Sequence, residues 1–281
     1  MSKVPEHLGS LTLGRQVGVG RHCQVWEAVD TASGQRVAVK AVVPEMARDT
    51  GQRRLLKHEL DVARHLDHPA IIRIDRFSTA GGLPHLVMEL YPHANLKKQI
   101  TAGVDEIAPR LHRIVTQVAW ALDHMHGRGW VHRDVKPDNV LASVDGEVKL
   151  IDLAIAARKP GMIRRLLGVK APAQGSPSYI APEQIRGLPV DPRSDIYSLG
   201  CTLFELLTGM PPFTASTTED LYQKHLAATP PAVEAFNRNA TVSVSKLIRQ
   251  MLAKKPADRP PSMKAVVQQI GAIKFLSRVG G

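Results

Sequence analysis

The spacing of apolar residues changes at about residue 92, and this change limits the folds open to the chain. Upstream, apolar and polar residues alternate in four stretches: LTLGRQVGVG, QVWEAVDTASG, QRVAVKAVV and IIRIDRFSTAGGLPHLVMEL. The dipeptides SG at 33–34 and GG at 81–82 mark turns between strands. Such alternation predicts half-buried antiparallel strands. The intervening stretch QRRLLKHELDVARHLDH has apolar residues at helical spacing, so one helix beside a small sheet is expected.

Downstream, the apolar residues follow helical spacing instead. In RLHRIVTQVAWALDHMHG, Ile114, Val118 and Leu122 lie on one helical face, and SDIYSLGCTLFELLTG is apolar nearly all round, as in a buried helix. SVSKLIRQMLAK and SMKAVVQQIGAI predict two more helices. The sequence therefore predicts a bilobal α+β fold, with a small antiparallel β-sheet lobe and one main helix over roughly 1–90 and a larger, mostly α-helical lobe over 92–281.

The composition excludes several classes of protein. A formal charge of +11 favours anionic partners, but only 4% of residues are aromatic and none interleave with a basic stripe, so nucleic acid is not expected as a partner. Cys23 and Cys201 are too few for a disulfide framework and are expected to be free thiols in a reducing compartment. No signal sequence is visible, and no uncharged apolar run reaches the roughly 18 residues of a membrane span. A cytoplasmic protein without a membrane segment is expected.

One carboxylate, Asp152, lies in the aliphatic run VKLIDLAIA. An ionised Asp costs several kcal/mol or more to remove from water unless it is hydrogen-bonded, paired or bound to a metal. The residues of this run alone leave two interpretations open. Asp152 is either a strand-end residue that closes a turn, or a metal ligand.

Four further motifs occur in a fixed order around this run. GVGRHCQV (18–25) forms a glycine turn between strands, where backbone N–H groups can approach phosphate oxygens. VAVK (37–40) is followed by a helix that contains Glu59, a partner for the lysine. HRDVKPDN (132–139) concentrates a base, a cation and a carboxamide in one loop, and GSPSYIAPE (175–183) follows. The glycine turn and the lysine each have a simpler explanation alone, as a plain hairpin and a solvated charge, but their common order is very unlikely by chance.

In this order the sequence resembles the Hanks-type, eukaryotic-like serine/threonine protein kinase family, over about residues 11–272. Loop sequences such as DPRSDIYSLG look like those of bacterial members. The resemblance implies transfer of the γ-phosphoryl group of ATP to Ser or Thr hydroxyls of protein substrates, with Mg²⁺ as the metal and Mn²⁺ as an alternative. It implies a single kinase domain over 1–281, with an N-lobe at about 1–90, a hinge at about 89–92, a C-lobe at about 92–281 and an activation segment at 152–183.

The resemblance also implies roles in the catalytic loop and at the metal. Asp134 would accept the proton of the substrate hydroxyl, and Lys136 would neutralise the transferring phosphate. Lys at this position and the GSPSYIAPE segment are typical of Ser/Thr specificity. Asn139 and Asp152 would be the metal ligands, so that the metal supplies the missing counter-charge of Asp152.

For the nucleotide, the resemblance implies that Lys40 binds the α and β phosphates and is held by Glu59. The other residues expected to line the nucleotide site are Gly18, Val19, Gly20, Val25, Ala38, Met88, Glu89, Tyr91, Asn95 and Leu141.

Four residues resemble structural supports of the family. Ser176 would steady the catalytic Asp and Lys, Asp195 would anchor the catalytic loop, and Glu183 and Arg259 would form an ion pair. Asp195 and the pair of Glu183 and Arg259 are not expected to take part in the chemistry.

Two positions depart from the family pattern. The DFG motif reads DLA, so Ala154 replaces a glycine and would be strained by roughly 1 kcal/mol if the backbone there were left-handed. Cys23 replaces the third loop glycine; a functional thiol there would need a lowered pKa, and the simpler interpretation is a tolerated small residue. These departures are the only support for a pseudokinase that binds without turnover. A small-molecule kinase is a further alternative, which GSPSYIAPE and ADRP (257–260) disfavour.

The activation segment lacks phosphorylatable residues, since no Ser, Thr or Tyr occurs over 153–174. Arg133, which in many relatives pairs with a phosphate on this segment, has no such partner within it. We therefore expect that phosphorylation of the central loop does not activate the enzyme. The segment also carries Arg158, Lys159, Arg164, Arg165 and Lys170 without an acidic residue. This pattern indicates a docking surface for acidic substrates, a site for an anionic regulator, or a solvated basic loop.

Overall fold

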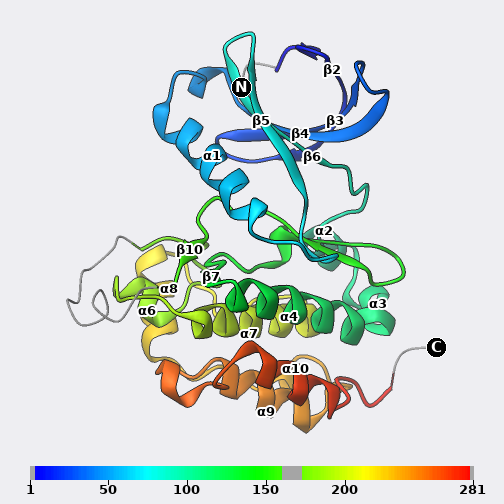
Figure 1. Cartoon of the computed structure of the whole chain (residues 1–281). Coiled ribbons are helices and arrows are strands. Elements are labelled where there is room, and N and C mark those ends of the chain that lie inside the picture. The colour runs from blue at the N-terminus through cyan, green and yellow to red at the C-terminus, as the bar shows by residue number, and fades with distance from the viewer. Residues whose placement is uncertain (1–3, 160–172, 279–281) are drawn as a thin grey trace. The chain divides into compact units, whose positions relative to one another are not determined.

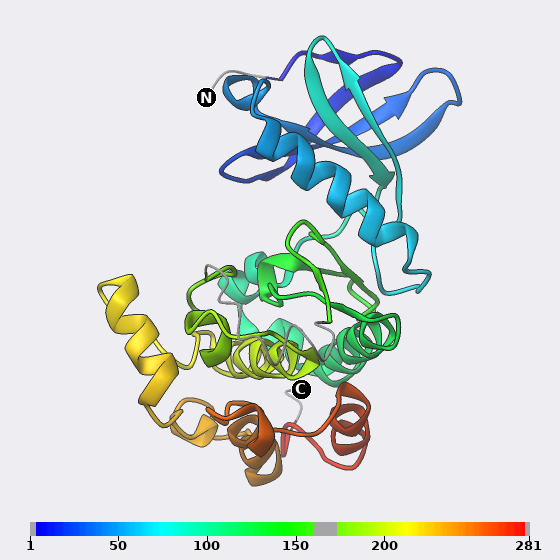
Figure 2. The same cartoon turned by 60° about the vertical axis from the view of Figure 1, so that its left-hand side comes forward.

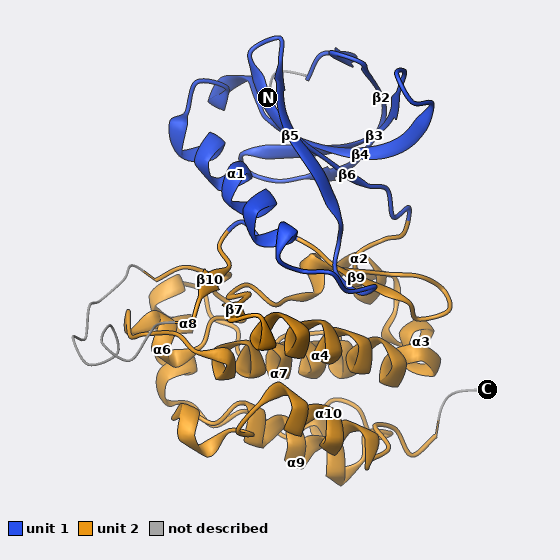
Figure 3. Ribbon diagram, in the orientation of Figure 1, with its two compact units in different colours: residues 1–92, 152–154 blue, residues 93–151, 155–281 orange. Residues whose placement is uncertain are grey.

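The computed structural model describes residues 4–159 and 173–278. Contacts within the chain divide it into two compact units, coloured separately in Figure 3. The units comprise residues 1–92 with 152–154, and residues 93–151 with 155–281.

A curled antiparallel sheet builds the first unit, as the alternating apolar pattern predicts (Figure 1). The strand order is β1-β2-β3-β4-β6-β5. The bounds are β1 (His7–Leu8), β2 (Leu11–Val19), β3 (Cys23–Asp30), β4 (Gln35–Val42), β5 (Ile74–Ala80) and β6 (Leu83–Glu89). Gly81 and Gly82 join β5 to β6 with φ angles of 56° and 78°, which favour glycine at both turn positions. The sheet buries Leu11, Trp26 and Val39 on its inner side.

The one main helix of this unit is α1 (Thr50–Arg64), drawn beside the sheet in Figure 2. Its first turn is capped by Asp49, whose carboxylate accepts hydrogen bonds from the amides of Gly51 and Gln52. The helix packs against β5 and β6 through an apolar face that includes Leu56 and Leu60. Glu59 lies on this same buried face and is the only charged residue among the buried positions of α1.

The second unit is mainly helical. Its helices are α2 (Leu96–Ala102), α3 (Val104–Ile107), α4 (Leu111–Gly127), α6 (Pro182–Ile185), α7 (Pro192–Thr208), α8 (Thr218–Ala227), α9 (Val242–Met251) and α10 (Met263–Gly271). α7 is buried nearly all round, as predicted, and packs against α4, α9 and α10. Within the described ranges, no helix is both long enough and apolar enough to cross a membrane.

Two pairs of short strands carry the loops between α4 and α6. β7 (Trp130–Val131) pairs with β10 (Ala157–Arg158), and β8 (Val140–Ala142) pairs with β9 (Val148–Leu150). Along the chain, β7 and β8 flank the HRDVKPDN loop, and β9 and β10 flank the DLA segment.

Candidate functional site

Lys40, Glu59 and Asp152 form a hydrogen-bonded cluster in the first unit. The Lys40 ammonium on β4 donates to both carboxylate oxygens of Glu59 on α1, at 3.1 and 2.8 Å, and to Oδ1 of Asp152 at 2.9 Å. The backbone amide of Leu153 donates to Glu59 Oε1 at 3.3 Å. Glu59 thus joins the strand lysine to the DLA segment, and Lys40 supplies a positive charge beside Asp152.

Charge and burial oppose each other in this cluster. Burial disfavours the charged form of Lys40, but the carboxylates of Asp152 and Glu59 outweigh it and raise the Lys40 pKa. Burial raises the pKa of the Glu59 carboxyl, and Lys40 counteracts that effect. Lys40 is therefore a permanent cation at this position, with donors directed at two carboxylates.

The glycine turn lies between β2 and β3. The Gly20 amide donates to the Cys23 carbonyl at 2.8 Å, which closes the turn. A Cβ atom at Gly18 would lie 3.3 Å from the Val25 Cβ, so the turn leaves little room for a side chain. Burial raises the pKa of the Cys23 thiol to about 11, against which the opposing effect of Lys40 is smaller. Cys23 is therefore a neutral thiol, which supports the interpretation of a tolerated small residue over a reactive one.

The DLA segment does not carry the expected strain at its alanine. Among the described residues other than glycine, only Arg133 and Asp152 have positive φ angles, of 72° and 65°. The left-handed residue is the aspartate itself, and Asp tolerates this conformation better than most residues. The condition under which Ala154 would be strained is not met, and the Leu153 side chain is fully buried, with 0% exposure.

A second cluster surrounds Asp134 in the helical unit. The Asn139 side-chain amide donates to Asp134 Oδ2 at 3.1 Å and to the Asp134 backbone carbonyl at 2.8 Å. The Lys136 ammonium lies 2.9 Å from Asp134 Oδ2 and donates to the Ser176 hydroxyl at 2.5 Å. The Ser176 backbone amide donates to Asp134 Oδ1 at 2.8 Å. Both carboxylate oxygens of Asp134 are therefore held in place, by two residues of its own loop and by Ser176 of the GSPSYIAPE segment.

Asn139 suits a hard metal ion. Its amide nitrogen is used by Asp134, whereas its side-chain oxygen accepts no hydrogen bond within the described part of the chain. Carboxamide and carboxylate oxygens are the ligands that Mg²⁺ prefers in proteins. Asn139 and Asp152 both supply this type of oxygen.

Asp195 binds the backbone of the HRDVKPDN loop. Its carboxylate is fully buried and accepts hydrogen bonds from the backbone amides of His132 and Arg133, at 2.9 and 2.8 Å, and from His126 Nε2 at 2.8 Å. Burial alone would raise the Asp195 pKa, but these donors, His126 foremost, hold it below its usual value. The predicted anchoring role of Asp195 is confirmed, and the anchored amide of Arg133 directly precedes Asp134.

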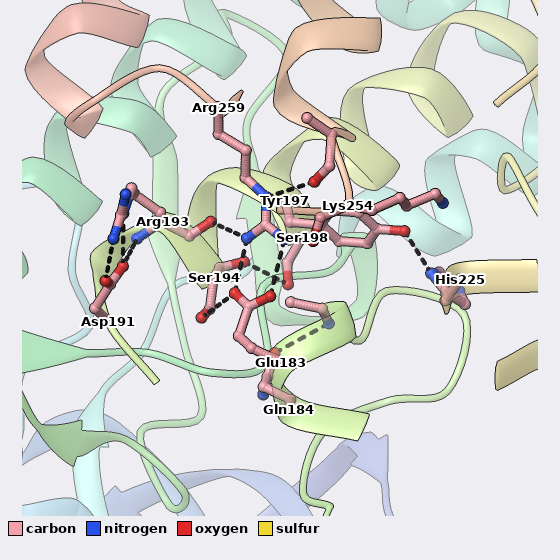
Figure 4. A network of polar contacts seen from close by, with 12 residues as sticks. Glu183, Gln184, Asp191, Arg193, Ser194, Tyr197, Ser198, His225, Lys254 and Arg259 are labelled. Atoms are coloured by element: carbon pink, nitrogen blue, oxygen red, sulfur yellow. Dashed lines mark hydrogen bonds and ion pairs between the residues drawn. The ribbon is translucent and has the colours of Figure 1, made fainter. Parts of the chain in front are cut away.

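Glu183 and Arg259 form the predicted ion pair, which is bidentate (Figure 4). Arg259 Nη1 and Nη2 donate to the two carboxylate oxygens at 2.7 and 2.8 Å, and the Ser194 hydroxyl donates to Glu183 Oε1 at 2.6 Å. The neighbouring Gln184 donates to the Arg133 carbonyl at 3.0 Å. The end of the activation segment is therefore bound to both α7 and the catalytic loop.

The remaining predicted nucleotide residues are distributed over both units. Ala38 and Met88 face each other across β4 and β6. Asn95 and Leu141 lie in the helical unit, where they form an isolated bridge. The Asn95 side chain is already committed, because its oxygen caps α2 at Lys98 and its nitrogen donates to the Asp138 carbonyl. Val25 and Lys40 are direct neighbours across β3 and β4, and Gly18, Val19, Gly20, Glu89 and Tyr91 lie in the first unit.

A buried carboxylate that sequence reasoning missed supports the GSPSYIAPE segment. Glu205 on α7 is 0% exposed and accepts hydrogen bonds from the Tyr179 hydroxyl and from the Lys97 ammonium, each at 2.5 Å. Lys97 and Glu205 are 108 positions apart, so no local pattern indicates their pairing. The only signal in the sequence is a carboxylate within the apolar C-terminal half of α7.

The beginning of the basic activation segment is tied to the loop before the catalytic motif. The Lys159 amide donates to the Gly129 carbonyl at 2.8 Å, and the Arg158 guanidinium stacks on the Trp130 ring at 4.4 Å. Arg164, Arg165 and Lys170 lie outside the described residues.

Comparison with known proteins agrees with this geometry. The sequence profile of the protein kinase domain matches residues 11–270. The chain is 33% identical over 260 residues to the serine/threonine-protein kinase PknB of Mycobacterium tuberculosis, covering 91% of this chain and 41% of PknB. It is also 33% identical over 257 residues (90% of this chain, 38% of the relative) to a Streptomyces coelicolor protein described as a probable serine/threonine-protein kinase.

A Clostridium acetobutylicum protein with the same description is 31% identical over 261 residues, which are 92% of this chain and 39% of that protein. The chain thus spans about two fifths of the length of the curated relatives it matches. The bilobal α+β architecture predicted from the sequence is confirmed. Because the kinase profile covers nearly the whole chain, which itself carries the motif order described above, the chain belongs to the protein kinase family.

Proposed function

We propose that this chain is an active serine/threonine protein kinase that transfers the γ-phosphoryl group of ATP to hydroxyls of protein substrates. The observation that carries the proposal is the Asp134 carboxylate, fixed by Lys136, Asn139 and the Ser176 amide. Catalysis of phosphoryl transfer depends mainly on positioning and charge neutralisation. A carboxylate fixed in this way suits a base that accepts the proton of a substrate hydroxyl.

The other proposed site residues bind the phosphates and the metal. Lys136 neutralises charge on the transferring phosphate, and Lys40, held by Glu59, binds the α and β phosphates. Asn139 and Asp152 hold Mg²⁺, with Mn²⁺ as an alternative; when bound, the metal neutralises phosphate charge. The proposed hinge spans about 89–92 and the activation segment 152–183. The residues proposed to surround the nucleotide are Gly18, Val19, Gly20, Val25, Ala38, Met88, Glu89, Tyr91, Asn95 and Leu141.

A pseudokinase is the second candidate, and the structure gives it little support. Ala154 has no positive φ angle to strain it, and Cys23 lies in an ordered turn with its thiol neutral. Lys40 has its expected partner Glu59, and it also contacts Asp152, a contact that the sequence did not predict. A small-molecule kinase is disfavoured because the 175–183 segment, which shapes the peptide site in protein kinases, is bonded directly to Asp134 and Lys136.

The test is transfer of label from radiolabelled ATP in the presence of Mg²⁺, alone and with a generic basic and a generic acidic protein. Asp134→Asn and Asp152→Ala serve as controls, because the first removes the proposed base at nearly constant volume and the second removes a proposed metal ligand. Label on Ser or Thr that disappears in both controls supports the proposal. Measurable ATP binding by the folded protein without any transfer would favour the pseudokinase instead.

We further propose that activity does not require phosphorylation of the central activation loop. The support is chemical, since residues 153–174 contain no hydroxyl. The first hydroxyls that follow are Ser176, which accepts from Lys136, and Ser178. Protein treated with phosphatase and the Ser178→Ala variant should both retain full activity. Strong activation that depends on phosphorylated Ser178 would contradict this proposal.

The basic activation segment is proposed to favour acidic substrates. Arg158 and Lys159 begin a run that also contains Arg164, Arg165 and Lys170, with no acidic residue between them. Reversal of Arg164 and Arg165 to Glu should raise KM for acidic peptides selectively. An equal rise in KM for neutral peptides would show that these arginines do not select acidic substrates.

A further inference from the structure

A pocket of about 450 Å³ lies in the helical unit, against the structural ion pair of Figure 4. Its wall is built from α6 and the loop that follows it, the start of α7, and the segment after α9. Among its lining residues are four cations and two carboxylates. The cations are Arg186, Arg193, Lys254 and Lys255, and the carboxylates are Glu183 and Asp191.

Both carboxylates are already neutralised by arginines. Glu183 is bound by Arg259 through two hydrogen bonds, at 2.7 and 2.8 Å. Asp191 caps α7 and accepts from Arg193 Nη2 at 2.7 Å and Nε at 3.1 Å. Neither carboxylate is therefore available to compensate the remaining cations of the pocket.

Three cations remain without an ion pair in the described part of the chain. Arg186 and Lys255 are exposed, and Lys254 is half-buried with its ammonium over the rings of Phe213 and Tyr197, at 4.5 and 5.8 Å. Within the part of the chain that the structure describes, the one hydrogen bond of the Lys254 ammonium is a long contact of 3.4 Å to the Lys224 carbonyl. Burial lowers the Lys254 pKa to about 8, and no carboxylate offsets this effect. These contacts of the Lys254 ammonium are with residues that do not line the pocket, so Arg186 and Lys255 are the cations considered for an anionic ligand.

The pocket also has an apolar wall. Leu188 is 42% exposed, and Pro189 and Pro256 line the same space. Exposed apolar surface rimmed by uncompensated charge is typical of a protein-binding site. We propose that this pocket binds an acidic segment of a partner protein, whose carboxylates pair with Arg186 and Lys255 while an apolar side chain packs on Leu188.

The position of the pocket indicates what kind of partner this is. α6, which forms one wall, is bonded through Gln184 to the backbone carbonyl of Arg133, the residue before Asp134. A chain bound in the pocket therefore lies beside the segment that holds the proposed base. The bound partner is accordingly a substrate protein, an assignment that rests on the proposed kinase function and extends it to a docking surface separate from the basic activation segment.

The experiment measures binding without ATP, so that a failure of docking is distinguished from a failure of catalysis. The probes are peptides on an array, in which the number of acidic residues and a central Leu or Gly vary independently. The wild-type chain should bind acidic peptides with a central Leu in preference to neutral ones. In Arg186→Gln/Lys255→Gln the preference should fall roughly tenfold, as expected for loss of two charge contacts beside an apolar surface.

A matched control removes the same charge elsewhere. Arg54 and Arg64 are exposed on α1, and Arg54→Gln/Arg64→Gln should retain the preference of the wild-type chain. Leu188→Ser should abolish the discrimination between Leu and Gly peptides while the preference for acidic residues remains. Both pocket variants alter exposed side chains, and their thermal unfolding should match that of the wild-type chain.

Three outcomes would overturn the proposal. The first is a wild-type chain that binds acidic and neutral peptides equally. The second is an equal loss of the preference in both double variants, which would show a general charge effect. The third is complete displacement of the acidic peptides by a low concentration of inorganic phosphate, which would identify a site for free anions.

The pocket is not part of the proposed catalytic site. The rate of phosphate transfer to a short neutral peptide should therefore be unchanged in Arg186→Gln/Lys255→Gln.

Discussion

The hydroxyl of Ser176 accepts a hydrogen bond from the ammonium of Lys136 at 2.5 Å, and the two residues are 40 positions apart in the chain. Ser176 also donates its backbone amide to Asp134 Oδ1. One residue of the activation segment therefore contacts both side chains that are proposed to act at the transferred phosphate. Its two contacts can be separated by mutation, since only one of them involves the side chain.

Ser176→Ala should lower kcat while ATP binding remains unchanged. The substitution keeps the amide contact to Asp134 but leaves Lys136 without its hydroxyl partner. A lysine that is free to move neutralises charge less well, and kcat should fall about tenfold or more. Steady-state kinetics of Ser176→Ala and Ser176→Thr measure the effect, and Thr should restore most of the rate. An unchanged kcat in Ser176→Ala would show that the hydroxyl does not position Lys136.

Lys40→Met should destabilise the protein as well as inactivate it. Glu59 is 1% exposed, and without the ammonium it becomes a buried carboxylate whose only hydrogen-bond donor among the described residues is the Leu153 amide. Breaking such a pair costs about 3 kcal/mol or more. Urea unfolding of Lys40→Met, Glu59→Leu and the double variant measures the coupling. The double variant should regain much of the stability lost by Lys40→Met, and strictly additive losses would contradict a coupled pair.

Much of this architecture could be predicted because the long elements carry periodic patterns. The sheet strands, α1, α4 and α7 follow alternating or helical spacing over many residues. By contrast, α3 and α6 span four residues each, and β7 and β10 only two, so no period is visible in them. Such short elements are fixed by contacts with distant segments, which a sequence pattern does not record.

The site divides in the same way. Asp134, Lys136 and Asn139 lie within one motif, so the sequence alone brings them together. By contrast, Lys97 pairs with Glu205, and Gln184 binds the Arg133 carbonyl, only because folding brings remote segments together. No local pattern in the sequence indicates either contact. The sequence also left open a left-handed backbone, and hence strain, at Ala154, whereas the left-handed residue of the DLA segment is Asp152.

Ala154→Gly should therefore not raise activity. Because Ala154 lies outside the left-handed region, glycine relieves no strain there. The added freedom of the unfolded chain should instead lower the free energy of unfolding by roughly 0.5–1 kcal/mol. Kinase assays and urea unfolding of Ala154→Gly check both parts. A large increase in kcat would show that alanine restricts a conformation that the catalytic cycle needs.

His225 should make the protein sensitive to acid. It is 0% exposed, its Nδ1 is hydrogen-bonded to the Tyr197 hydroxyl at 2.9 Å, and its buried Nε2 has no hydrogen-bond partner within residues 4–159 and 173–278. Burial, followed by the nearby Lys254 charge, lowers the His225 pKa from 6.5 to about 4. The folded protein therefore keeps His225 neutral in a range of pH where the unfolded chain binds a proton.

The sign of the effect follows from this difference. Stability from neutral His225 is fully present above pH 6.5 and is lost as the pH falls toward about 4, because protons then favour the unfolded chain. The full loss is on the order of 3 kcal/mol, at about 1.4 kcal/mol per pKa unit. In His225→Phe the free energy of unfolding should fall less over the same range, although the variant is less stable at neutral pH because Tyr197 loses its partner. Urea unfolding of both proteins across this range gives the difference directly, and parallel pH dependences would mean that His225 is not the group responsible.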